Sequence, residues 1–139
     1  MNQAQELGRL DILVCSAGTA AIEFMTPSEE AVFLENIPLE TWNRTIDVNL
    51  MGVVYGTHTF IPHMKATGDE CWLINVASMA GMGGVPLDGA YTATKAAVVA
   101  LTEAWALELA STPIHVSVLA PAFVKTRIHQ SYRNRQPRY

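Results

Sequence analysis

Three short apolar runs, separated by long stretches of helical character, constrain the fold of this chain more than any other feature. The runs cover residues 10–15, 72–77 and 115–119. Continuous apolar runs of this length are typical of strands covered on both faces in parallel sheets. The intervening stretches, 39–66 and 89–110, are long enough to supply the helices of right-handed crossovers. We therefore expect an α/β fold with a parallel sheet and helices on both faces, in three layers.

Reactive side chains follow these runs, where parallel sheets bind ligands. Ser78 comes directly after the second run, Tyr91 lies thirteen residues later, and Lys95 lies four residues beyond Tyr91. Residues four apart share one face of a helix, so the Lys95 ammonium can approach the Tyr91 phenol. An ammonium in a partly dry cleft favours phenolate, which predicts that the pKa of Tyr91 is lowered by roughly three units. Tyr91 would then act as general acid or base, and Ser78 would hold the substrate oxygen.

A tyrosine and a lysine at this spacing arise often by chance, but the serine and its flanking elements make the pattern specific. The segments NVASMAG, residues 75–81, and YTATKAA, residues 91–97, resemble the S-x12-Y-x3-K signature of the short-chain dehydrogenase/reductase family. That resemblance implies a Rossmann-like fold and a reaction that interconverts an alcohol and a carbonyl. It also implies a catalytic role for Ser78, Tyr91 and Lys95.

Asn49, within DVNLMG at residues 47–52, resembles the asparagine that completes the family's catalytic tetrad. Asparagine is a weak helix former, so its place in an otherwise apolar helix needs a reason. The resemblance implies a local helix distortion that holds a water, through which the lysine exchanges protons with solvent. The alternative is an amide that neighbouring backbone groups satisfy.

The segment PAFVKT, residues 121–126, is similar to the family's P-G-x-V-x-T, with Ala122 in place of glycine. The resemblance implies that Pro121, Val124 and Thr126 hold the nicotinamide together with the catalytic tyrosine and lysine. For Thr126, an ordinary loop hydroxyl or a helix N-cap is the alternative.

The segment DILVCSAG, residues 11–18, resembles the family's strand that ends in N-N-A-G. Gly18 is retained, and the resemblance implies that it lies beside the cofactor. Cys15 and Ser16 replace the two asparagines and cannot reproduce the hydrogen bonds of two carboxamides.

The resemblance extends from about residue 8 to residue 126, and we interpret 1–126 as a partial Rossmann-like domain that lacks the N-terminal half of the fold. The 139 residues contain no G-x-x-x-G-x-G, the turn with which the family holds the cofactor pyrophosphate at a helix N-terminus. The resemblance implies NAD or NADP as the cofactor, and the sequence does not distinguish between the two. A short surface helix is expected to begin within residues 26–30. Residues 127–139 are expected to form a basic tail or the start of a substrate-covering segment.

Two functions of different classes remain open. One is an NAD(P)-dependent oxidoreductase that interconverts an alcohol and a carbonyl. The other is a catalytically inactive remnant that serves at most for oligomerisation or interaction.

The helices at 39–66 and 89–110 are apolar on nearly every side, as expected for helices covered from more than one direction. We expect a homodimer or homotetramer through these two helices, with burial inside one chain as the alternative. A net charge of −4 argues against nucleic acid as a partner. The sequence has no apolar run that suggests a membrane span, no secretory signal, and no histidine spacing typical of metal sites. With two cysteines outside any disulfide framework, we expect reduced thiols and a cytoplasmic protein.

Overall fold

A computed structural model describes residues 8–20, 33–126 and 128. Its three strands form one parallel sheet in the order β1-β2-β3. The strands are β1 (Ile12–Cys15), β2 (Cys71–Val76) and β3 (Ile114–Leu119). The α-helices are α2 (Leu39–Ile46), α3 (Gly52–Thr67) and α4 (Gly89–Glu108). Short helical turns are η1 (Leu34–Asn36), η2 (Asp47–Met51) and η3 (Met79–Gly81). The predicted parallel α/β sheet is therefore confirmed, with each of the three expected strands and both long helical stretches in place.

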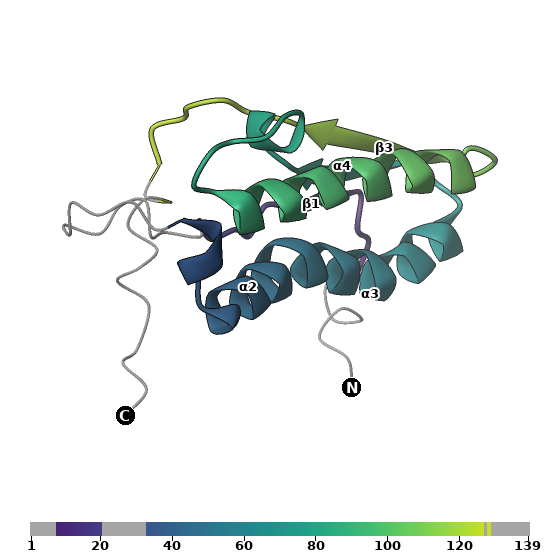
Figure 1. Cartoon of the computed structure of the whole chain (residues 1–139). Helices are drawn as coiled ribbons and strands as arrows, with labels where there is room; N and C mark the ends of the chain where they lie inside the picture. Colours follow the sequence, from purple (N-terminus) through teal and green to yellow (C-terminus); the bar gives the residue numbers. More distant parts are fainter. Residues whose placement is uncertain (1–7, 21–32, 127, 129–139) are drawn as a thin grey trace.

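The helices lie on one face of the sheet (Figure 1). Helix α3 packs on β1 and β2, whereas α4 packs on β2 and β3. Strand order follows chain order, so two crossovers of the same hand bring both connecting helices to the same side. The part of the chain that the structure describes thus supplies one of the two expected helical layers. On the opposite face, Ile12 and Val14 are 54% and 51% exposed.

Apolar side chains between the sheet and the helices form two clusters. One lies toward the start of the strands, and the other lies toward their C-terminal ends. The first comprises Met64, Cys71, Leu73, Leu109 and Ile114, and the second comprises Val53, Ala77 and Val98. Burial of each large side chain contributes about 1.5–3 kcal/mol. The second cluster supports the edge of the sheet where the candidate site residues gather.

The helical stretch predicted at 39–66 is continuous, but η2 within it is a π-helix. The N–H of Gly52 bonds to the carbonyl of Asp47, five residues earlier. Helix α3 ends at Gly68, whose φ of 70° is the left-handed conformation that glycine adopts at helix ends. The distortion that the family resemblance implies is therefore present at Asn49.

Among the described helices, none is both long and apolar enough to cross a membrane. The helix start expected within 26–30 and the tail expected at 127–139 lie outside the described residues, except for Ile128.

Candidate active site

Lys95 lies in α4 with its side chain turned toward the C-terminal end of β2. The residue is 3% exposed, and its Nζ donates a hydrogen bond to the carbonyl oxygen of Val76 at 2.9 Å. The same nitrogen lies 5.7 Å from the centroid of the Tyr91 ring, one turn earlier on the helix. Burial lowers the pKa of Lys95 from its ordinary value. The predicted approach of the ammonium to Tyr91 is therefore present, over the face of the ring.

The side chain of Ser78 interacts with the hydroxyl of Tyr91, which brings the serine and the tyrosine of the predicted motif together. The pKa of Tyr91 is raised, chiefly because the phenol is partly buried and secondarily because Asp88 is nearby. The interaction with Ser78 lowers the Tyr91 pKa and so acts in the opposite direction. The expectation of a lowered Tyr91 pKa is therefore wrong for this structure. The reason is geometric: the Lys95 ammonium bonds to the Val76 carbonyl and faces the ring, while burial disfavours phenolate.

Ser78 owes its position to a close contact between η3 and α4. It caps η3 in an extended conformation, and its Oγ accepts a hydrogen bond from the N–H of Ala80 at 3.1 Å. A Cβ atom at Gly81 would lie 2.6 Å from the carbonyl carbon of Lys95, a distance that backbone atoms do not tolerate. Only glycine permits this contact, so Gly81 brings Ser78 against the helix that carries Tyr91. The sequence alone did not reveal that Gly81 permits this close contact, although Gly81 is the last residue of the NVASMAG segment.

Asn49 is fully buried in the π-helix, and its side chain reaches two other segments. Its Oδ1 accepts from the N–H of Thr19 at 2.7 Å, and its Nδ2 donates to the Thr19 carbonyl at 2.9 Å. The Nδ2 also donates to Thr94 at 3.2 Å, and the Thr94 hydroxyl donates to the Tyr91 carbonyl at 2.8 Å. Backbone groups thus satisfy much of this amide, as the alternative interpretation held. A water relay at Asn49 stays a prediction.

Gly18 lies where the loop after β1 meets Lys95 and Asn49. A Cβ atom on Gly18 would be 3.5 Å from Lys95 Nζ and 3.6 Å from Asn49 Oδ1. The half-buried Cys15 ends β1, and burial raises the pKa of its thiol, an effect that the nearby Thr57 side chain only partly offsets. Cys15 occupies one of the two positions where the family has asparagine. It is a packed, protonated thiol there.

The segment after β3 passes beside η3 (Figure 1). The carbonyl of Pro121 accepts a hydrogen bond from the N–H of Met79 at 3.0 Å, directly next to Ser78. Val124 is exposed, and the exposed Thr126 accepts a hydrogen bond from the N–H of Ile128 at 3.3 Å. The structure thus brings Pro121 to the site region and leaves Val124 and Thr126 facing solvent.

Comparisons with known proteins agree with this parallel α/β fold. The family model described as short chain dehydrogenase matches residues 1–137. The 3-oxoacyl-[acyl-carrier-protein] reductase FabG of Thermotoga maritima is 35% identical over 122 residues, which are 88% of this chain and 46% of that protein.

Solved structures show the same similarity. A short chain dehydrogenase/reductase from Burkholderia phymatum in complex with NAD has a TM-score of 0.85 at 32% identity, covering 96% of this chain and 45% of that one. The structure of ElxO with NADP bound has a TM-score of 0.77 at 28% identity, covering 95% and 50%.

By its fold, the protein belongs to the class of Rossmann-like α/β proteins with a parallel sheet. More narrowly, the chain belongs to the short-chain dehydrogenase/reductase family. It spans about half the length of the relatives that it matches.

Proposed function

We propose that the protein is an NAD(P)-dependent oxidoreductase that interconverts an alcohol and a carbonyl. The observation that carries this proposal is the interaction of Ser78 with the Tyr91 hydroxyl beside the buried Lys95 ammonium. Two hydroxyls side by side can hold one substrate oxygen, and a buried cation next to them favours negative charge that develops there. The membership of the chain in a dehydrogenase family supports the same reaction type.

Tyr91 carries the proton in this proposal. Because its pKa is raised, the phenol is protonated at neutral pH and is ready to donate to the oxygen of a carbonyl that is being reduced. Ser78 donates to the same oxygen and fixes its position. In the opposite direction, Tyr91 has to ionise before it accepts the proton of an alcohol, and the Lys95 ammonium stabilises that phenolate.

The residues around Lys95 fit the nicotinamide end of a dinucleotide. The ammonium has three donors, and its hydrogen bond to the Val76 carbonyl uses one of them. The others suit acceptors such as ribose hydroxyls. Gly18 leaves room next to the ammonium that a side chain would fill. When bound, the cofactor supplies or accepts the hydride. The fit concerns this end only, because the 139 residues contain no glycine-rich pyrophosphate loop.

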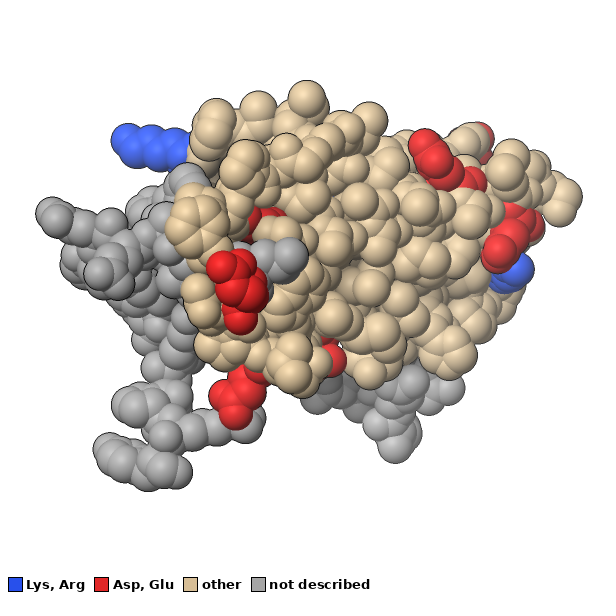
Figure 2. All heavy atoms as spheres, in the orientation of Figure 1, with Lys and Arg blue, Asp and Glu red and all other residues tan. Residues whose placement is uncertain are grey.

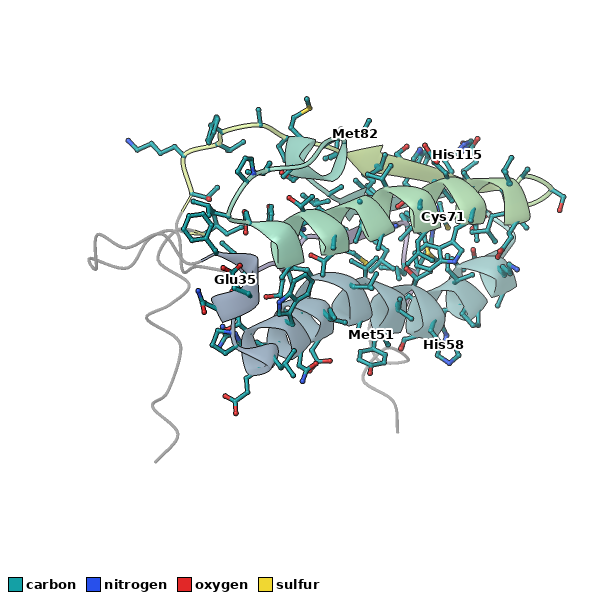
Figure 3. All side chains as sticks on the ribbon, in the orientation of Figure 1. Glu35, Met51, His58, Cys71, Met82 and His115 are labelled. Atoms are coloured by element: carbon teal, nitrogen blue, oxygen red, sulfur yellow. The ribbon has the colours of Figure 1, made fainter. Side chains whose placement is uncertain are left out.

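We further propose that the substrate presents an apolar body beside its reactive oxygen. The segment between Ser78 and Tyr91 carries no charged residue from position 79 to position 87. Instead it exposes Met79, Met82 and Val85, and Met82 lies next to η3 in Figure 3. Flexible methionines adapt to apolar groups of irregular shape. An uncharged secondary alcohol or ketone with a hydrocarbon body matches this lining better than a hydroxy acid.

We also propose that α3 and α4 form the contact between copies of the chain. On the face of Figure 2 that these helices share, the middle is largely free of charged side chains. A hollow of about 230 Å³ lies between the two helices and is lined by apolar side chains such as Ile61 and Trp105 together with the charged Lys65 and Glu108. Leu107 and Tyr55 are 80% and 62% exposed nearby on the same helices. Exposed apolar area of this kind is typical of association surfaces.

The inactive-remnant alternative differs from the oxidoreductase in one measurable property. An oxidoreductase changes the absorbance of reduced nicotinamide when it is given a ketone or an alcohol, and the change depends on Tyr91. We expect the protein from the complete reading frame to show this change with an alicyclic ketone. Oligomerisation with no turnover on any alcohol or ketone, with either cofactor, would favour the remnant instead.

A further inference from the structure

Strand β2 and helix α4 are joined by two hydrogen bonds that start from adjacent residues of the strand. The carbonyl of Val76 accepts from Lys95 Nζ at 2.9 Å, and Asn75 Nδ2 donates to Thr102 Oγ1 at 3.0 Å. Lys95 and Thr102 lie seven residues apart, which is two turns, and therefore share one face of α4. Both bonds therefore join the same face of α4 to the C-terminal end of β2, and one of them holds the candidate catalytic lysine.

The hydrogen bonds of Thr102 fix the orientation of the Asn75 amide. The Thr102 hydroxyl donates its single proton to the carbonyl of Val98 at 2.6 Å. Only acceptor capacity then remains on Thr102 Oγ1, so the group that faces it must be the NH₂ of Asn75. The pair is directional, and an apolar or acceptor side chain at position 75 cannot replace it.

Stability alone does not explain this pair. Asn75 is fully buried and Thr102 is 2% exposed, beside the apolar residues Leu73 and Val98. Asn75 Oδ1 is buried without a hydrogen-bond partner within the described residues. A buried acceptor left unsatisfied opposes folding, and two apolar side chains of similar size would avoid that penalty. Buried polar groups of this kind are best known for fixing the register between packed elements.

We propose that Asn75 and Thr102 form a positioning pair that sets the register of α4 on β2 and so holds the Lys95 ammonium at the Val76 carbonyl. A slide of one residue along a helix is about 1.5 Å. A displacement of that size along the bond lengthens the 2.9 Å contact to about 4.4 Å, beyond hydrogen-bond range. The pair therefore acts on Lys95 through the position of the whole helix and touches neither Tyr91 nor the substrate.

The test uses a variant that removes the pair without leaving a buried polar group behind. In Asn75→Val with Thr102→Val, both partners become apolar at similar volume, a change that is close to neutral for stability. Thr102→Ser keeps the hydroxyl and should restore the pair. Thr45→Val is the matched control, because Thr45 is fully buried and its hydroxyl bonds to the Thr41 carbonyl in the same i−4 manner, within α2.

The first readout is the NMR signal of the Lys95 ammonium in the 139-residue chain, which requires no turnover. We expect the double valine variant to keep its unfolding midpoint while the Lys95 signal moves and its proton exchange with water becomes at least tenfold faster. Thr102→Ser and Thr45→Val should both leave that signal in place. An unchanged Lys95 signal in the folded double variant would overturn the proposal, as would an equal change in Thr45→Val. If the double variant is unfolded, the single Thr102→Val variant compared with Thr102→Ser decides in the same way.

The second readout rests on the proposed function and is made in the protein from the complete reading frame. The double valine variant should lower kcat about tenfold, leave KM for the ketone within twofold, and shift the pH profile. Thr102→Ser should stay within twofold of the parent protein in kcat. Absence of turnover in the parent protein would contradict the proposed function alone, because the Lys95 signal still decides whether the pair positions the lysine.

Discussion

The side chain of Asn49 bonds to both backbone polar groups of Thr19, at 2.7 Å and 2.9 Å, although the two residues lie thirty positions apart. A third bond, to Thr94, connects the same amide to the first turns of α4. The π-helix that contains Asn49 thus ties the loop after β1 to the helix that carries the candidate catalytic tyrosine. Asn49 therefore holds the loop after β1 and helix α4 together at the site.

Asn49→Ala should lower the free energy of unfolding by about 2–4 kcal/mol, because it removes three hydrogen bonds from a fully buried position. Thr94→Val removes the hydroxyl that receives one of those bonds and should lower it by about 1 kcal/mol. Urea unfolding of the two variants measures both values. An equal loss of unfolding free energy in the two variants would contradict the conclusion that Asn49 anchors both segments.

Gly81→Ala should destabilise the protein by about 1–3 kcal/mol, because the new methyl group meets the backbone of Lys95 at 2.6 Å and overpacks the contact. Gly83→Ala is the matched control, since a Cβ there meets nothing within 4 Å, and it should change stability by less than about 0.5 kcal/mol. Thermal unfolding compares the two. A neutral Gly81→Ala variant would show that η3 does not need its close approach to α4.

The lowered pKa of Lys95 predicts a pH dependence of stability with a definite sign. The unfolded chain binds this proton more tightly than the folded chain, so stability should rise with pH between the lowered pKa and the ordinary value of about 10.5. The raised pKa of Tyr91 acts in the opposite sense, but only above about pH 10. Urea unfolding from neutral pH up to about pH 9.5 should show the rise, and Lys95→Met should flatten it. The same slope in both proteins would rule out Lys95 as its source.

Leu107→Glu should shift the protein toward the monomer, because it places a charge on the apolar surface of α4 where we propose that copies meet. Leu39→Glu is the control: Leu39 is equally exposed, at 79%, and lies at the start of α2. Sedimentation velocity distinguishes the species. If the parent protein is a monomer, or if both variants dissociate equally, the surface is not the contact.

Much of the fold could be predicted from the sequence, because apolar runs and helical stretches are local signals. The three strands and the helical stretch at 89–110 are close to their predicted bounds. The approach of Lys95 to Tyr91 followed from their spacing on one helix, whereas the place of Ser78 beside Tyr91 was implied by the family resemblance.

The Tyr91 pKa, the requirement for Gly81 and the role of Asn75 could not be predicted, because they depend on contacts between distant segments. Whether burial or the ammonium governs the pKa of Tyr91 depends on where Lys95 Nζ finds its acceptor, which is the Val76 carbonyl. The glycine that η3 requires at position 81 depends on how closely α4 approaches. Asn75 stood in the motif without a role, because its partner Thr102 is seven residues beyond the motif's lysine.

The most direct test of the whole account is turnover by Tyr91→Phe in the protein from the complete reading frame. This substitution removes only the phenolic oxygen and keeps the partly buried ring beneath the Lys95 ammonium. The account predicts that kcat falls at least about a thousandfold, as expected for loss of an essential proton donor. The affinity for reduced nicotinamide cofactor, measured by its fluorescence, should remain within about threefold. Near-normal turnover in Tyr91→Phe would contradict the account.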